Sequence, residues 1–265
     1  MLKIGILGCG FACNNKLDER LNPWFNVAKE LNIVFSFVSA RFIEYEKLGI
    51  KQDNRITKNI LLDYKNLGQL QYLECPETTL SEAEARDLAL QHLLKENCDL
   101  TYLLDLSDEF YTEQQIKNIF NFINKEDNQY VAWFSTPMKN YIFDGTQQWV
   151  DGFSPPRCFK TVFGSSKLTR VYFDNDMEYT SGLGQKIDYK FLPTRQIPKH
   201  LINKGIKHIT WTHENGKLKE KYQRQHFSNN LCSYKFNEKT QKLEFDIDGY
   251  YKKLNIPVPE VHADE

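Results

Sequence analysis

Short apolar runs alternate along residues 2–135 with segments in which apolar side chains recur every three to four positions. Short apolar runs bounded by turn residues are typical of buried strands, and the longer period is typical of amphipathic helices. The predicted strands cover residues 2–7, 33–38, 70–75, 100–104 and 130–135. Strands that alternate with helices in this way predict a largely parallel sheet with helices on both faces.

Two of the predicted helices begin with the same short signature. Ser81 is followed three residues later by Glu84, and Thr112 is followed by Gln115. These are the pairs of a capping box, in which each side chain bonds the backbone N–H of the other residue. The apolar stripe behind the first pair predicts a helix over residues 82–95.

The chain before the second predicted strand shows a different start signal. Asn22 is followed by Pro23, which predicts a helix capped by the asparagine with the proline at its first position. Residues 40–68 mix polar and apolar positions without a clear period. We expect this second stretch to be a surface excursion.

Composition and charge narrow the class of protein. The 265 residues are 41% hydrophobic and 26% charged, which is ordinary for a globular chain, and their length fits one domain. Lys and Arg number 34 against 35 Asp and Glu, so no overall field favours nucleic acid or an anionic membrane. No apolar run approaches the roughly 18 residues of a spanning helix, and we find no signal peptide. We therefore expect a cytoplasmic protein whose six cysteines are free thiols.

The first predicted strand ends in glycines. Gly8 and Gly10 begin like a dinucleotide-binding fingerprint, but Cys13 stands at the third glycine position. Arg41, after the second strand, would suit the 2′-phosphate of NADP. One interpretation is therefore an NAD(P)-dependent oxidoreductase with a Rossmann fold, and the other is a glycine turn between a strand and a helix.

A cluster of carboxylates follows the fourth predicted strand. Asp105, Asp108 and Glu109 fall within five positions, and in a parallel sheet ligands bind beyond the carboxyl ends of the strands. Carboxylates this close repel one another unless a cation lies between them, and Mg²⁺ or Mn²⁺ prefers such oxygen ligands. The alternative is that Asp108 and Glu109 complement the dipole of the helix that starts near residue 112. That alternative explains Asp105 less well.

These motifs together resemble a known family. Residues 103–111, LLDLSDEFY, look like the DxDEF(Y) segment of nucleotide-sugar glycosyltransferases with the GT-A fold, in the broad family-2-like group. Residues 8–14 with Pro23-Trp24 are similar to its first strand and nucleotide-contacting loop. Residues 81–89, SEAEARDLA, resemble the helix before its metal motif, and residues 208–211, HITW, resemble its HxSW segment.

The resemblance implies a fold and a donor site. It implies one GT-A-like (Rossmann-like) domain over 1–265, with a mostly parallel central sheet flanked by helices. Its parts would be a nucleotide-sugar and metal half at 1–111, an acceptor half at 112–250 and a tail at 251–265. The donor would lie over the ends of the first, second and fourth strands. The expected donor-binding residues are Gly8, Cys9, Gly10, Phe11, Ser39, Arg86, Lys219 and Lys221.

The resemblance also implies a metal site. The family's carboxylates are one residue apart, whereas two residues separate Asp105 from Asp108. Residues i and i+3 of a strand do not share a face, so both can reach one cation only where the backbone turns between them or water intervenes. We expect Asp108 as the direct ligand with Asp105 beside it. Family members often add a C-terminal histidine, for which His208 and His226 are the candidates.

The second half adds candidates for the acceptor side. An inverting transfer needs a carboxylate that deprotonates the acceptor hydroxyl, and Asp174 and Asp176 are the candidates for this catalytic base. A turn rich in Asp and Asn is the alternative explanation. Seven basic residues gather between 199 and 224, and such a patch would neutralise a diphosphate leaving group or form a solvated face.

The predicted function is a metal-dependent glycosyltransferase of the hexosyltransferase type. It would transfer a sugar from a UDP- or GDP-sugar to a glycan or another hydroxyl acceptor, with Mn²⁺ or Mg²⁺ as cofactor. Nucleic acid and a transmembrane segment are not expected. Two alternatives stay open: the NAD(P)-dependent oxidoreductase, and a GT-A-fold protein that binds without catalysis.

Overall fold

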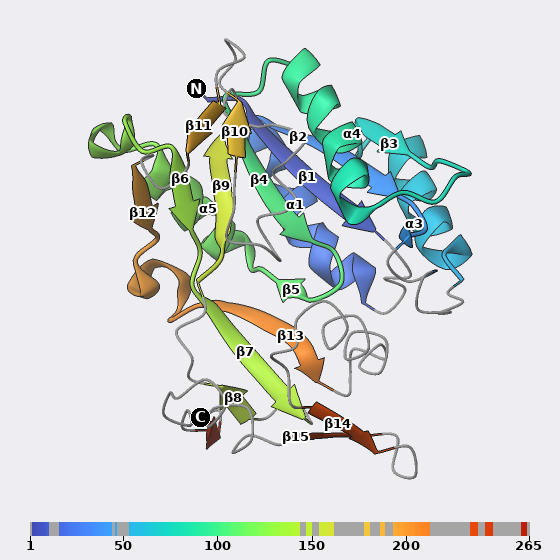
Figure 1. The fold of residues 1–265 in the computed structure, drawn as a ribbon. Helices are drawn as coiled ribbons and strands as arrows, with labels where there is room; N and C mark the ends of the chain where they lie inside the picture. The colour runs from blue at the N-terminus through green and yellow to red at the C-terminus, as the bar shows by residue number, and fades with distance from the viewer. Residues whose placement is uncertain are drawn as a thin grey trace.

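A seven-stranded sheet is the main element of the computed structural model, in the order β12-β6-β9-β4-β1-β2-β3 (Figure 1). The structure describes residues 2–10, 16–43, 46, 53–143, 147–149, 154–161, 178–180, 186–188, 193–212, 234–237, 242–245 and 261–263. The strands of the sheet are β1 (Ile4–Gly10), β2 (Ile33–Ser39), β3 (Tyr72–Glu74), β4 (Leu100–Asp105), β6 (Trp133–Ser135), β9 (Pro156–Lys160) and β12 (Thr194–Gln196).

Most neighbours in this sheet are parallel. β1 lies between β2 and β4 and is parallel to both, β3 is parallel to β2, and β12 is parallel to β6. β9 runs antiparallel between β4 and β6. The sheet and its helices therefore form the mostly parallel α/β domain that the sequence predicts. The antiparallel β9 was not predicted.

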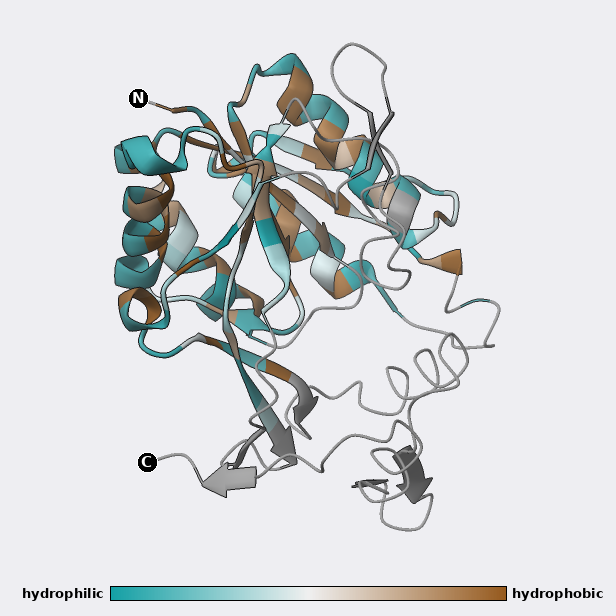
Figure 2. Ribbon diagram, turned by 60° about the vertical axis from the view of Figure 1, so that its left-hand side comes forward, coloured by the Kyte–Doolittle hydropathy of each residue, from teal (hydrophilic) through white to brown (hydrophobic). Residues whose placement is uncertain are grey.

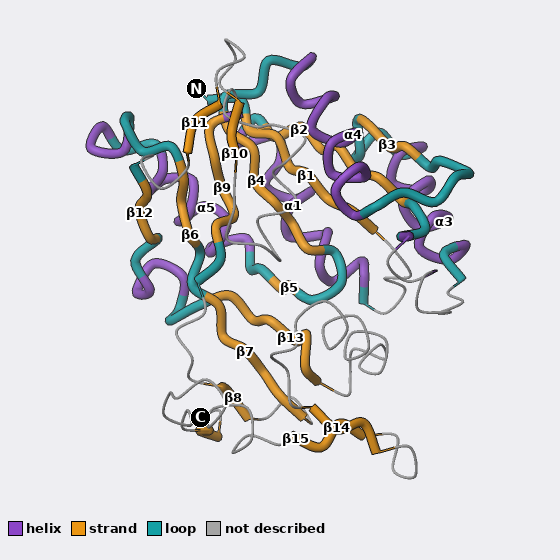
Figure 3. Tube along the Cα trace, viewed as in Figure 1, coloured by secondary structure: helices purple, strands orange, loops and turns teal. Residues whose placement is uncertain are grey.

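Helices cover both faces of the sheet (Figure 3). They are α1 (Leu17–Leu31), α3 (Arg55–Asn66), α4 (Glu82–Lys95) and α5 (Glu113–Ile123). Neighbouring side chains on a strand point to opposite faces. Accordingly, Ile6 packs in the core cluster that contains α1, α3 and α5, whereas Leu7 packs in the cluster that contains α4. Apolar residues concentrate on the sheet and on the inward sides of these helices (Figure 2).

Helix α1 begins earlier than the sequence predicts. It starts at Leu17, and Pro23 lies inside it. Leu17, Leu21 and Trp24 share one face and are each at most 1% exposed. Burying large apolar side chains contributes about 1.5–3 kcal/mol each, which offsets the backbone hydrogen bond that a proline cannot make. The prediction that the helix begins at Pro23 is therefore wrong.

The expected surface excursion at 40–68 contains a helix. α3 occupies Arg55–Asn66, and Thr57 and Leu61 are its buried residues. Only these two residues of the helix are buried, and polar residues outnumber apolar ones along it, which explains why the helix was missed. The other predicted elements correspond to β1, β2, β3, α4, β4, α5 and β6, within a few residues at their ends.

A second sheet adjoins the first at the acidic segment. Its order is β16-β8-β7-β13-β5, and its strands are β5 (Glu109–Phe110), β7 (Met138–Phe143), β8 (Gln147–Trp149), β13 (Ile206–Thr212) and β16 (Val261–Ala263). β5 follows β4 after a three-residue turn and pairs antiparallel with β13, so it joins the two sheets (Figure 1).

Smaller elements complete the described part of the chain. β10 (Glu178–Thr180) pairs with β11 (Lys186–Asp188), and β14 (Tyr234–Asn237) pairs with β15 (Lys242–Phe245). Short 3₁₀ helices lie at Glu126–Asn128 (η1) and Lys199–Ile202 (η5). Among the described residues, none of the helices has the length and apolar character needed to cross a membrane.

Both predicted capping boxes are present. The Glu84 N–H donates to the Ser81 hydroxyl over 3.1 Å, and the Ser81 backbone N–H donates to the Glu84 carboxylate over 2.7 Å. In α5 the Gln115 N–H donates to the Thr112 hydroxyl over 3.2 Å, and the Thr112 N–H donates to the Gln115 amide oxygen over 2.9 Å. The boxes differ in one chemical respect, because glutamate titrates and glutamine does not.

This difference gives a prediction about pH. The Ser81 backbone N–H, and the Ser81 hydroxyl over 2.9 Å, both donate to Glu84 Oε2 and hold the pKa of Glu84 below its usual value. The stability that these bonds contribute is present above the unfolded pKa and is lost as pH falls, and Ser81→Ala removes the hydroxyl's part of it. Ser81→Ala should lower the free energy of unfolding by about 1 kcal/mol near neutral pH, and by less in acid. The matched change Thr112→Ala should cost a similar amount at both pH values. Urea unfolding measures both, and equal pH dependence in the two variants would contradict the prediction.

Candidate functional site

The predicted donor residues and the acidic segment lie at one edge of the central sheet. The strand register places Gly10 opposite Ser39 of β2, and Cys9 opposite Asp105 of β4. β2, β1 and β4 are adjacent and parallel, so their carboxyl ends meet at this edge. The structure therefore brings Gly8, Cys9, Gly10, Ser39 and Asp105 together, as the sequence predicts.

The two glycines belong to the strand and form no turn within it. Gly8 pairs with β2 and β4, Gly10 pairs with β2, and neither has a positive φ. A Cβ on Gly8 would lie 2.9 Å from the Phe37 ring, and one on Gly10 would lie 3.2 Å from Thr57 Cγ2. Close packing therefore accounts for both glycines. A dinucleotide fingerprint needs its first glycine in the tight turn, so the oxidoreductase interpretation is not favoured.

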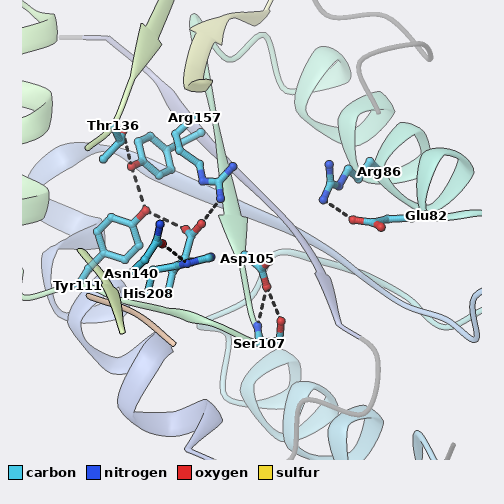
Figure 4. A network of polar contacts seen from close by, with 11 residues as sticks. Glu82, Arg86, Asp105, Ser107, Tyr111, Thr136, Asn140, Arg157 and His208 are labelled. Carbon is cyan, nitrogen blue, oxygen red and sulfur yellow. Dashed lines mark hydrogen bonds and ion pairs between the residues drawn. The ribbon is translucent and has the colours of Figure 1, made fainter. Parts of the chain in front are cut away.

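The acidic segment forms a turn between the two sheets. We call residues 105–110 the acidic turn: β4 ends at Asp105, residues 106–108 turn, and β5 begins at Glu109. Asp105 Oδ1 accepts hydrogen bonds from the Ser107 N–H over 2.8 Å and from its hydroxyl over 2.7 Å (Figure 4). Asp108 is 2% exposed. The backbone thus turns between Asp105 and Asp108. Residues three apart on a straight strand could not both reach one cation, and this turn removes that obstacle.

Glu109 is engaged in a buried ion pair. Its Oε1 accepts from the Arg157 guanidinium of β9, and its Oε2 accepts from the Tyr111 hydroxyl over 2.8 Å (Figure 4). Glu109 is fully buried, and Arg157 is 1% exposed. Burial raises the pKa of Glu109, and Arg157 opposes that rise. The idea that Glu109 only complements the dipole of the following helix is therefore wrong.

A hydrogen-bonded chain extends from Glu109 into the core. The Tyr111 and Tyr102 hydroxyls lie 3.1 Å apart, and the Tyr102 hydroxyl lies 3.1 Å from Thr136 Oγ1 (Figure 4). The Tyr111 hydroxyl donates its hydrogen bond to the Glu109 carboxylate. The Tyr102 hydroxyl therefore donates to the Tyr111 oxygen, and the Thr136 hydroxyl donates to the Tyr102 oxygen. Burial raises the pKa of both tyrosines, which keeps these protons in place. The network fixes the Glu109 end of the acidic turn to the core.

A second charged group approaches the same edge from α4. Arg86 forms an ion pair with Glu82 one helical turn earlier (Figure 4). Burial lowers the pKa of Arg86, but the negative charges of Glu82 and Asp105 raise it overall. Burial raises the pKa of Cys9 to about 12, against the effect of Arg86, so Cys9 is a neutral thiol. Arg86 thus supplies fixed positive charge beside Cys9 and Asp105, and its predicted role in donor binding stays a prediction.

His208 lies next to the acidic turn on β13. It pairs with Glu109 of β5, and its Nδ1 lies 2.8 Å from Asn140 Oδ1 of β7 (Figure 4). A proton on Nδ1, donated to the Asn140 oxygen, leaves the lone pair on Nε2, which is the form of imidazole that binds a metal. His208 is 8% exposed. The structure thus places this predicted residue beside the acidic turn.

Among the described residues, no three His, Cys, Asp or Glu side chains are grouped so that they could hold a metal ion. Asp105, Asp108 and His208 therefore do not form a three-ligand cluster in this structure. Mg²⁺ is commonly held by one or two carboxylates together with substrate phosphates, so Asp105 and Asp108 stay the predicted ligands.

Several predicted residues lie outside the described part of the chain. They are Phe11, Lys219 and Lys221 for the donor, Asp174 and Asp176 for the base, and His226 for the metal. Of the six cysteines predicted as free thiols, Cys9, Cys75, Cys98 and Cys158 are described, and all four are free.

The sequence reasoning missed the residues that hold the acidic turn in place. Arg157 follows two prolines on a strand that the sequence did not place beside β4, and Tyr111 was read only as part of a motif. Arg20 on α1 donates to the Leu106 carbonyl over 3.1 Å, although 86 positions separate the two residues. No local spacing connects partners so far apart.

The fold and the site define an α/β protein with an acidic, oxygen-rich turn at the carboxyl edge of its parallel strands. No protein-family model matches the chain, and no curated protein matches its sequence.

Solved structures with a similar arrangement include TarS of S. aureus in complex with UDP, with 14% identity and a TM-score of 0.41. That alignment covers 76% of this chain and 62% of TarS 1–349. A TarS crystal structure aligns with 16% identity over 61% of this chain and 29% of its own, with a TM-score of 0.40. A Desulfovibrio desulfuricans protein named as a nucleotide-diphospho-sugar transferase aligns with 10% identity over 75% and 80% of the chains, with a TM-score of 0.39. The likeness is one of partial fold.

Proposed function

We propose that this chain is a glycosyltransferase that takes its sugar from a nucleoside-diphosphate donor. The acidic turn carries the proposal, because it presents Asp105 and Asp108 at the carboxyl edge where β1, β2 and β4 end together. The resemblance of residues 103–111 to the family's DxDEF(Y) segment supports the same conclusion. Arg86 adds positive charge beside this edge, which suits a diphosphate.

The oxygen ligands at the turn fit a hard divalent cation. Asp105 and Asp108 would hold Mn²⁺ or Mg²⁺, with His208 as a further candidate ligand and Asn140 orienting its ring. When bound, such a cation takes up the negative charge that develops on the departing nucleoside diphosphate. Glu109 has both oxygens engaged by Arg157 and Tyr111, so we assign it no ligand role.

The remaining parts of the proposal concern the sugar and the acceptor. The donor would be a UDP- or GDP-sugar, transferred to a glycan or another hydroxyl acceptor. Asp174 and Asp176 are proposed as the base that removes the acceptor proton if the transfer inverts the sugar. The basic residues Lys219 and Lys221 are proposed to contact the donor phosphates.

Thermal unfolding with UDP, GDP, CDP, ADP and NADPH, each with and without Mn²⁺, tests this proposal. A ligand that binds only the folded state stabilises it by RT ln(1 + [L]/Kd), about 2.7 kcal/mol at a hundredfold excess over Kd. We expect one nucleoside diphosphate to raise the melting temperature much more with Mn²⁺ than without it. A shift with NADPH and with no diphosphate would contradict the proposal and restore the oxidoreductase.

Binding alone does not establish transfer. The matching nucleotide sugar should therefore release its nucleoside diphosphate in the presence of enzyme and Mn²⁺, slowly to water and faster once an acceptor is supplied. Tight, metal-dependent binding with no release under either condition would favour a GT-A-fold protein that binds without catalysis.

A further inference from the structure

An arginine from helix α1 contacts the acidic turn at two points. Arg20 is 2% exposed, and its guanidinium donates to the Leu106 carbonyl over 3.1 Å. The same guanidinium lies over the Phe110 ring, 4.7 Å from the centroid. One planar group therefore contacts the turn near its start and at its end, which a flexible ammonium would do less well. Arg20 comes from the opposite side of the sheet from α4 and Arg86.

Strands β9 and β13 hold the residues between these two points. Arg157 of β9 pairs with Glu109 inside the core. The Ile209 N–H of β13 donates to the Asp108 carbonyl over 3.0 Å, which fixes the backbone of the expected metal ligand itself. Contacts from α1, β9 and β13 thus reach Leu106, Asp108, Glu109 and Phe110 within one short segment.

The energetics of these contacts argue for a role besides stability. Removing charged groups from water is expensive, and a buried ion pair is often no more stabilising than apolar residues of similar volume. What buried arginines do provide is a fixed direction for the groups they bind, because the guanidinium fork allows few geometries. At this edge the fixed group is the backbone that carries Asp105 and Asp108.

We infer that Arg20 and Arg157 are positioning residues, which hold the acidic turn so that Asp105 and Asp108 are set for a divalent cation before it binds. The inference rests on the proposed function, since it concerns the same cation. Groups that orient metal ligands without touching the metal typically contribute 10- to 100-fold in metal affinity or activity. Removing either arginine should therefore lower the nucleoside diphosphate affinity in the presence of the metal more than it lowers the affinity in its absence.

The test compares nucleoside diphosphate binding in Mn²⁺ with binding in EDTA, by calorimetry, for the wild type and for Arg20→Met. The ratio of the two affinities should fall about 10- to 100-fold in the variant, while the affinity in EDTA stays near the wild-type value. The chain offers a matched control in Arg195→Met. Arg195 of β12 also lies over a phenylalanine, 5.5 Å from the Phe122 centroid, and donates to Asn128 Oδ1, but at the far edge of the sheet. For Arg195→Met, the ratio of the affinity in Mn²⁺ to the affinity in EDTA should equal that of the wild type.

Milder variants keep the inference testable if Arg20→Met does not fold. Arg20→Lys retains the charge and the stem but loses the planar fork, and Tyr111→Phe removes only the hydroxyl that orients Glu109. Arg20→Lys and Tyr111→Phe should each lower the ratio of nucleoside diphosphate affinity in Mn²⁺ to that in EDTA. Arg157→Lys should lower this ratio less than Arg157→Met does.

The failures of the two proposals are distinguishable. A wild type that binds no nucleoside diphosphate in Mn²⁺ would overturn both. A wild type that binds, together with folded variants that keep its ratio, would overturn the positioning role alone. An equal loss in Mn²⁺ and in EDTA would also overturn it, because that pattern reports general damage to the fold.

Discussion

Asp108→Asn is expected to abolish metal-dependent nucleoside diphosphate binding, with a loss of more than about 100-fold, beyond the range typical of groups that only support a ligand. Asparagine matches the size of aspartate and keeps one oxygen, but it lacks the charge that attracts a divalent cation. Asp108 is 2% exposed, and its backbone carbonyl accepts from Ile209 in either variant. Calorimetric titration with the nucleoside diphosphate in Mn²⁺ and in EDTA measures the loss.

Asp105→Asn removes the charge of the Asp105 side chain but keeps the hydrogen bonds that shape the turn. Asp105 Oδ1 accepts two hydrogen bonds from Ser107, and an asparagine oxygen can accept both. A lowered affinity in Mn²⁺ would therefore report the missing charge. The control is Asp127→Asn, which neutralises an exposed carboxylate of η1 and should bind as the wild type does. Metal-dependent binding that survives in both Asp105→Asn and Asp108→Asn would mean that the acidic turn is not the cation site.

The elements whose local signals are strong were predicted well. Both capping boxes and the helices that follow them occur where the sequence places them. The fourth strand is central, as its continuous apolar run suggests. These features depend on residues within a few positions of one another, so a single sequence contains the information that forms them.

The elements that were missed depend on distant contacts. α1 extends through Pro23 because Leu17 and Trp24 are buried against the sheet, and that burial outweighs the local signal. β9 inserts antiparallel between β4 and β6, although 50 or more positions separate it from β4. A strand's direction relative to its neighbours is set by the connections of the whole chain, which apolar spacing does not record.

The candidate site divides in the same way. Asp105, Asp108 and Arg86 are predicted as ligand-binding residues from residue type and motif spacing, and the structure places Asp105 and Arg86 within electrostatic reach of each other. The partners of the turn were not recognised, because Arg157 meets Glu109 across 48 positions and Arg20 meets Leu106 across 86. Local spacing therefore marks the groups that we propose to touch a ligand, and it does not mark the groups that hold the acidic turn.

Arg157→Met should have the largest effect on folding. Removing one partner of a buried ion pair leaves the other charge without compensation and typically costs 3–5 kcal/mol. Glu109 would then stay fully buried beside Asp105 without its guanidinium. The double variant Glu109→Gln/Arg157→Met should regain most of the lost stability, because glutamine carries no charge and its amide oxygen can still accept the hydrogen bond from the Tyr111 hydroxyl. Urea unfolding of the two variants and the wild type measures both differences.

The pH dependence of the single variant identifies the cause. Burial and the Asp105 charge raise the pKa of Glu109, and Arg157 opposes them, so Arg157→Met should raise it further. A carboxyl group whose folded pKa exceeds its unfolded value gives stability that is present below the unfolded pKa and is lost as pH rises. The deficit of Arg157→Met should therefore grow as pH rises above the unfolded pKa of the Glu109 carboxyl, and the double variant should lack this trend. A deficit independent of pH, or a double variant as unstable as the single one, would show that lost packing and not the unpaired Glu109 charge destabilises the protein.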